Sequence, residues 1–161
     1  MQTLTRTVRS IDKSGASLDI PFRSWSERGI SLRRGEVSMV AGNPGAGKST
    51  IALAVALKSQ QPTLYFSMDS HASTMAIRSL AMITGLPQRE CEERMALDQA
   101  WASDLLALYA GHISWCFDSN PSLYDVEDEI EIYREMKGSD PVLIVVDNAT
   151  DVTHDDGDEF G

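Results

Sequence analysis

A short glycine-rich segment carries the clearest chemistry in this sequence. Residues 42–50 read Gly-Asn-Pro-Gly-Ala-Gly-Lys-Ser-Thr, which fits the pattern G-x-x-x-x-G-K-[ST]. The glycines allow backbone torsions that are closed to other residues, and they let main-chain N–H groups approach an anion. The helix expected to follow the segment would point the positive end of its dipole at the same anion. The sequence therefore predicts a phosphate-binding loop, or P-loop.

Each position of this loop has an expected role toward a nucleoside triphosphate. Lys48 is predicted to reach the β- and γ-phosphates, Ser49 to give its hydroxyl oxygen to Mg²⁺, and Thr50 to lie beside the α-phosphate. The predicted nucleotide-binding residues are Gly42, Asn43, Pro44, Gly45, Ala46, Gly47, Lys48, Ser49 and Thr50. We predict ATP and Mg²⁺ as the cofactors, with ATP preferred over GTP because the sequence lacks the Asn-Lys-x-Asp element usual for guanine.

Two carboxylates at predicted strand ends complete the expected site. Asp147 ends an apolar run, where a carboxylate can hold a Mg²⁺-bound water opposite Ser49, the role called Walker B. Asp69 directly follows another apolar run, at a place where hydrolysis needs a base or water-orienting group near the γ-phosphate. The alternative for Asp69 is an N-cap of the helix that follows. The predicted catalytic residues are Lys48 and Asp69, and the predicted metal-site residues are Ser49 and Asp147.

The predicted strands and helices that carry these residues alternate along the chain. Strands are expected over 36–41, 63–67, 112–117 and 141–147, and helices over 49–58, 70–84, 88–110 and 122–138. This alternation predicts an α/β fold of the P-loop NTPase kind, with a mainly parallel sheet covered by helices. The carboxyl ends of parallel strands meet at one edge, so the ligand is expected there.

Side-chain spacing within two of the helices makes further predictions. In the 88–110 helix an apolar stripe is expected to face the core: Leu97, Trp101, Leu105 and Leu108. In the last helix, Ser122 followed by Asp125 indicates a capping box at the start, and Gly138 indicates the end.

The composition fits a soluble protein of one domain. The chain has 161 residues, 42% of them hydrophobic, and no run long enough to span a membrane, so we expect a cytoplasmic protein with no signal peptide. The net charge of −10 argues against this polypeptide alone being a nucleic-acid binder. Cys91 and Cys116 are expected to be reduced thiols. His154 beside Asp155 and Asp156 lacks the fixed geometry of a metal site.

We divide the chain into three parts. Residues 1–34 are expected to be a polar, irregular lead-in, 35–150 the catalytic core, and 151–161 an acidic, flexible tail.

The span from Gly35 to Asn148 resembles the RecA-like ATPase core, most of all that of DnaB-type replicative helicases carried by bacteria and bacteriophages. The resemblance rests on the P-loop, on Leu-Tyr-Phe-Ser-Met-Asp at 64–69 with the helix carrying Met75, Ile77 and Arg78, and on Val-Leu-Ile-Val-Val-Asp-Asn at 142–148. It implies a hexameric ring that couples ATP hydrolysis to movement along single-stranded DNA. In that family a glutamate ends the second strand and activates water; the matching residue here is Asp69, one methylene shorter.

Cores of the resembling family continue past the Walker B strand with a sensor residue, DNA-contacting loops and an arginine finger. The strand that comes next in that family lies between the Walker A and Walker B strands. Because this chain ends at Gly161, the resemblance implies a partial core that lacks the C-terminal strands and contacts single-stranded DNA through regions absent from it.

Two other functions stay open at this point. One is a regulatory ATPase of the KaiC type that acts on protein partners, which the acidic composition favours. The other is a nucleotide-binding module without turnover. The Phe-Ser-Met-Asp stretch at 66–69 favours the helicase or recombinase interpretation.

Overall fold

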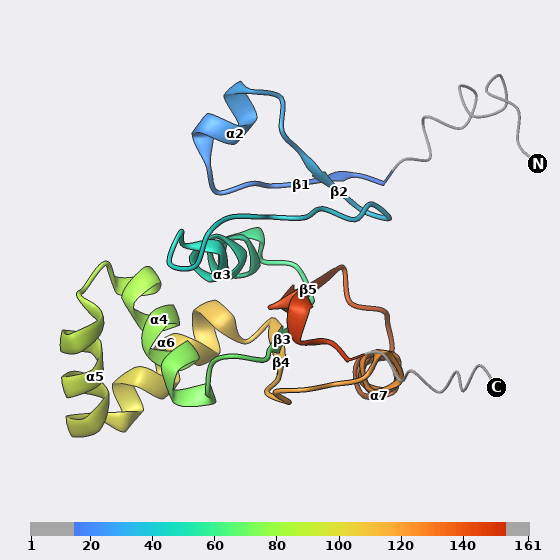
Figure 1. Ribbon diagram of the computed structural model, residues 1–161. Helices are drawn as coiled ribbons and strands as arrows, with labels where there is room; N and C mark the ends of the chain where they lie inside the picture. The colour runs from blue at the N-terminus through green and yellow to red at the C-terminus, as the bar shows by residue number, and fades with distance from the viewer. Residues whose placement is uncertain (1–14, 154–161) are drawn as a thin grey trace, which may run out of the picture.

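A three-stranded parallel sheet forms the centre of the structure, a computed structural model that describes residues 15–153 (Figure 1). β3 (Thr63–Ser67) is the middle strand, β4 (Ile113–Cys116) pairs with one side of it and β5 (Leu143–Asp147) with the other. All five residues of β3 are buried, as expected for a continuous apolar strand covered on both faces. The predicted α/β fold with a parallel sheet is confirmed.

Helices cover both faces of this sheet. They are α3 (Lys48–Ser59), α4 (Ala72–Thr84), α5 (Gln88–Leu97), α6 (Gln99–Ala110) and α7 (Leu123–Lys137). On one face Tyr65 packs with residues of α3, α4 and α6, among them Leu53 and Met75. On the other face Leu64 and Phe66 pack against Tyr133 of α7, which lies across the sheet from α3 in Figure 1. The alternation of side chains along β3 therefore builds two separate cores.

The capping signals of the last helix were predicted correctly. The Ser122 side chain accepts from the backbone N–H of Asp125, and the Asp125 carboxylate accepts from the backbone N–H of Ser122. Gly138 ends α7 in the left-handed conformation. The local chemistry of the sequence is sufficient to set these boundaries.

The prediction of one helix over 88–110 was wrong. The chain breaks at Asp98, whose carboxylate accepts from the backbone N–H of Trp101 at 2.9 Å and so caps α6. The break separates the expected apolar stripe: Trp101 and Leu105 pack in the cluster formed by α4, α5 and α6, whereas Leu97 is 89% exposed and Leu108 is 70% exposed. A side-chain cap offers the backbone an alternative to a continuous helix, and here the cap prevailed over the apolar periodicity.

The strand predicted over 36–41 is absent. Residues 36–43 have no regular secondary structure, and Val37 and Met39 are 99% and 85% exposed. A strand needs a paired neighbour, and within the described residues β5 pairs only with β3. The apolar segment and the second edge of β5 are thus both without a ladder partner in the part of the chain that is described.

The region before the P-loop is more regular than predicted. β1 (Ser17–Leu18) pairs antiparallel with β2 (Leu32–Arg33), and the short helix α2 (Arg23–Glu27) lies between them. Phe22, the N-cap of α2, packs against Trp25 within the helix, with the two ring centroids 5.0 Å apart. The earlier part of the predicted lead-in, His154 and most of the predicted acidic tail lie outside the described residues.

Cys91 and Cys116 are both free thiols, as predicted. Among the described residues, no helix has the length and apolar character needed to cross a bilayer.

Val37→Asp tests the unpaired state of the 36–41 segment. We expect the change to alter the free energy of unfolding by less than about 0.5 kcal/mol, because the parent side chain is exposed. Leu64→Asp in buried β3 is the matched control, with an expected loss of at least about 3 kcal/mol. Urea unfolding followed by tryptophan fluorescence measures both. A loss at Val37 as large as that at Leu64 would mean that the segment is a buried strand.

Candidate functional site

The P-loop is shaped by two glycines with left-handed backbone torsions. Gly45 has φ 77° and Gly47 has φ 86°, a region that L side chains rarely adopt. A turn closes where the N–H of Ala46 donates to the carbonyl of Asn43 at 3.1 Å. Gly47 is then the N-cap of α3, and its carbonyl accepts from the N–H of Ile51 at 3.0 Å. The loop therefore ends at a helix N-terminus, where unpaired N–H groups and the helix dipole favour an anion.

Lys48 folds back beneath the loop from the first turn of α3. Its Nζ donates to the carbonyl oxygens of Gly42 at 3.0 Å and Asn43 at 3.2 Å. The ammonium group is thus held against the loop backbone that is expected to surround the phosphates. Thr50, the last residue of the pattern, is exposed on the same turn of the helix.

Ser49 and Asp147, far apart in the sequence, meet in the structure. The Ser49 hydroxyl donates to Oδ1 of Asp147 at 2.9 Å. α3 delivers the serine, and the parallel pairing of β5 with β3 delivers the aspartate, which is only 8% exposed. The structure thus places the two residues predicted to form the metal site in direct contact.

Tyr65 is a part of the site that the sequence reasoning missed. Its hydroxyl donates to Oδ2 of Asp147 at 2.9 Å. Burial, and then the neighbouring Asp147 carboxylate, raise the pKa of Tyr65, so the phenol remains a protonated donor. A tyrosine hydroxyl in a strand that is buried along its whole length needs a hydrogen-bond partner, and this requirement could have pointed to Tyr65.

Asp69 lies at the same edge of the sheet but in a different setting. It is exposed, and its Oδ1 accepts from the Ser70 hydroxyl at 2.9 Å. Arg78 Nη1 donates to that same Ser70 oxygen at 3.1 Å. The N-cap of α4 is His71, so the alternative of Asp69 as the cap does not hold. In the structure Lys48 donates to the loop carbonyls and Asp147 accepts from Ser49 and Tyr65, so neither is hydrogen-bonded to Asp69.

The donor set at Ser49 and Asp147 fits Mg²⁺. Both atoms are hard oxygen ligands, which this ion prefers. Among residues 15–153 no group of three or more His, Cys, Asp or Glu side chains could hold a metal by itself. A site of this kind is therefore suited to Mg²⁺ that arrives with phosphates, because the ion is usually held by one or two carboxylates together with the substrate.

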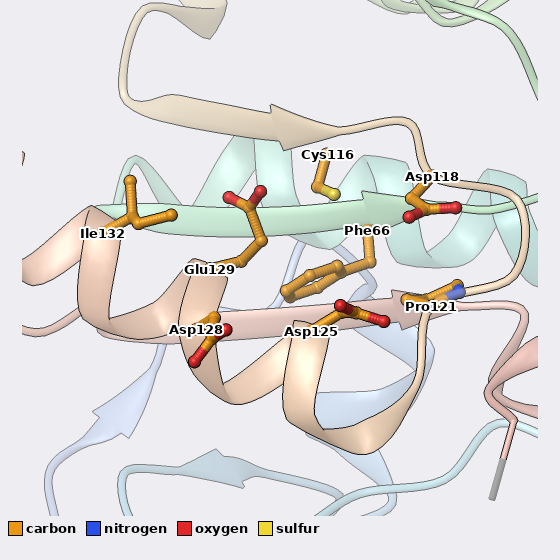
Figure 2. Close-up of a pocket in the computed structure, with 8 residues that line it drawn as sticks. All are labelled: Phe66, Cys116, Asp118, Pro121, Asp125, Asp128, Glu129 and Ile132. Carbon is orange, nitrogen blue, oxygen red and sulfur yellow. The ribbon is translucent and has the colours of Figure 1, made fainter. Parts of the chain in front are cut away.

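A groove of about 240 Å³ lies on the α7 face of the sheet (Figure 2). Its charged lining consists of Asp118, Asp125, Asp128 and Glu129, around Phe66. The backbone N–H of Ser122 lowers the pKa of Asp125, which keeps that carboxyl ionised. Such a lining repels phosphates, so the groove does not suit a nucleotide.

The parallel sheet, the helices on both of its faces and the glycine loop leading into α3 define a P-loop ATPase domain. The sequence matches the AAA domain family over residues 8–160. The Gene 65 protein of Mycobacterium phage L5 is 35% identical over 151 residues, covering 91% of this chain and 55% of that protein. The Gene 65 protein of Mycobacterium phage D29 is 37% identical over 123 residues, covering 74% of this chain and 52% of that protein.

The chain is also similar to bacterial replicative DNA helicases. The replicative DNA helicase DnaB of Pasteurella multocida is 29% identical over 133 residues, covering 76% of this chain and 28% of that protein. The chain belongs to the AAA domain family, and the expected resemblance to DnaB-type ATPase domains is confirmed. It spans about half the length of the phage relatives that it matches.

Lys48→Ala tests whether the glycine-rich loop binds the phosphates of a nucleotide. We expect at least a tenfold loss of affinity for a fluorescent ATP analogue with Mg²⁺, about 1.4 kcal/mol, because the change removes the positive charge that is bonded to the loop backbone. Lys58→Ala is the matched control, since Lys58 is an exposed lysine in the last turn of the same helix. Unchanged affinity in a folded Lys48 variant would contradict the assignment of the P-loop.

Proposed function

We propose that this chain is the ATP-binding and ATP-hydrolysing core of a DnaB- or RecA-like motor that moves on single-stranded DNA. Residues 35–150 form this core in the proposal, and the cofactors are ATP and Mg²⁺. The assembly proposed for the complete protein is a hexameric ring in the cytoplasm.

The contact between Ser49 and Asp147 carries the proposal. A P-loop serine and a buried strand-end carboxylate lie 2.9 Å apart, next to a lysine held beneath the loop. Phosphoryl transfer depends mainly on positioning and on stabilising negative charge, and these are the groups that supply both. The relatives called replicative DNA helicases support the motor function by similarity.

Asp69 is the proposed group that orients the attacking water. It lies two residues past the end of β3, at the carboxyl edge where the ligand of a parallel sheet binds. One oxygen of the Asp69 carboxylate accepts a hydrogen bond from the Ser70 hydroxyl, whose oxygen in turn accepts from Arg78. This bond occupies part of the group that would orient the water, so it favours a second candidate, a nucleotide-binding module without turnover. The two candidates differ in one measurable property, the rate of hydrolysis.

Asp69→Asn separates these candidates. We expect ATP binding within about twofold of the parent and at least a hundredfold loss of hydrolysis, because the amide keeps the size of the side chain but cannot act as a base. The measurement is phosphate release at saturating ATP and Mg²⁺. Asp118→Asn is the matched control, since Asp118 is an exposed aspartate that follows the neighbouring strand β4.

If Asp69→Asn hydrolyses ATP at the rate of the parent, Asp69 has no catalytic role. No hydrolysis in the parent would favour the binding module. Asp69→Glu is an informative third variant, since a rise in its turnover would show that the short aspartate side chain limits hydrolysis.

DNA binding by the 161-residue chain is expected to be weak or absent. The net charge of −10 repels the phosphates of DNA. Fluorescence anisotropy with labelled single-stranded DNA at several salt concentrations measures the affinity and its salt dependence. A sub-micromolar, strongly salt-sensitive affinity at physiological salt would contradict this expectation.

A further inference from the structure

Tyr65 connects the centre of the sheet to the predicted metal site. It is the middle residue of β3, and its side chain is fully buried. Its hydroxyl donates to Oδ2 of Asp147, whose other oxygen, Oδ1, accepts from Ser49. Both oxygens of this carboxylate are therefore bonded, each by a hydroxyl from a different element.

The register of the sheet explains how Tyr65 reaches the carboxylate. Ser67 of β3 lies opposite Asp147 of β5, and Tyr65 lies opposite Val145. Tyr65 and Asp147 thus point to the same face of the sheet, offset by two residues along it. Such diagonal neighbours are within reach of aromatic side chains, and the phenol spans the offset.

The ring of Tyr65 has little freedom to move. Its centroid lies 4.7 Å from that of Trp115 on β4, and it packs in the same cluster as Leu53 of α3 and Met75 of α4. Well-packed aromatic rings transmit their position to the polar group that they carry. The position of the phenol oxygen is therefore fixed by packing, and its hydrogen bond orients the Asp147 carboxylate.

A backbone hydrogen bond holds the main chain of Asp147 in place as well. The N–H of Met68 donates to the carbonyl oxygen of Asp147 at 2.9 Å, which extends the ladder one step past the end of β3. Backbone and side chain of Asp147 are thus both held by β3. The remaining rotation of the carboxylate about its Cβ–Cγ bond is what the Tyr65 hydroxyl restricts.

We propose that Tyr65 is a positioning residue that aims the Asp147 carboxylate at the Mg²⁺ of a bound nucleotide. The inference rests on the proposed function, because it assumes that Ser49 and Asp147 serve the ion. Hydrogen bonds to a ligating carboxylate orient it, and removing such a partner typically lowers metal affinity by about 10- to 100-fold. Tyr65 touches neither nucleotide nor ion in this proposal and acts through Asp147 alone.

Tyr65→Phe tests the proposal because it removes one oxygen and keeps the ring. The measurement is binding of a fluorescent ATP analogue over a Mg²⁺ titration, with a parallel series in EDTA. We expect about tenfold more Mg²⁺ for half-maximal metal-dependent binding, and affinity in EDTA within about twofold of the parent. Tyr133→Phe is the matched control, since Tyr133 is a buried tyrosine in the cluster on the opposite face of the sheet. Its Mg²⁺ requirement is expected to stay parental.

Three outcomes overturn the role of Tyr65: an unchanged Mg²⁺ requirement in Tyr65→Phe, an equal rise in Tyr133→Phe, or a lower requirement. The last would mean that the phenol competes with the ion for the carboxylate. Asp147→Asn reports on the proposed function separately. If that variant keeps parental Mg²⁺ dependence, the metal site itself is wrong; if it loses the dependence and Tyr65→Phe does not, only the positioning role fails.

A measurement on the unaltered sequence covers the case in which Tyr65→Phe does not fold. The chain has four tyrosines, so incorporation of 3-fluorotyrosine gives a small set of ¹⁹F resonances. We expect the Tyr65 resonance to shift when Mg²⁺ is added to the nucleotide complex, and the Tyr133 resonance to stay in place. No Mg²⁺-dependent shift at Tyr65, or an equal shift at both, would overturn the proposal.

Discussion

The arrangement of the site depends on the hydrogen bonds that the Asp147 carboxylate accepts. It is buried at the end of β5, and a buried carboxylate is stable only where donors satisfy it. Ser49 and Tyr65 supply those donors from α3 and β3. One side chain therefore links the helix that follows the glycine loop, the central strand β3 and the strand β5.

Parallel pairing explains why these elements meet at one edge. β3 and β5 run in register, so Ser67 and Asp147 end side by side, and the turn that carries Asp69 begins there. Side chains of α3 are packed against the same face of the sheet by the cluster around Tyr65. Packing on one face thus orders the polar groups at its edge, while the α7 face carries acidic side chains that are unsuited to phosphate.

The errors of the sequence reasoning have local physical causes. Periodicity alone favoured one helix over 88–110, but the Asp98 carboxylate accepts a hydrogen bond from the backbone N–H of Trp101 where the helix divides, and Leu97 is exposed. The apolar run at 36–41 has the composition of a strand. Strand formation requires a neighbour, and within the described residues none is paired with it.

Local sequence patterns were sufficient to predict the groups whose roles depend on near neighbours along the chain. Glycine spacing specified the loop, capping residues specified the ends of α7, and strand and helix alternation specified the parallel sheet, because each depends on residues close together along the chain. The meeting of the Ser49 and Tyr65 hydroxyls at the Asp147 carboxylate could not be predicted in this way. Such a contact depends on strand register, on the side to which each side chain points and on helix packing, and these follow from the whole core at once.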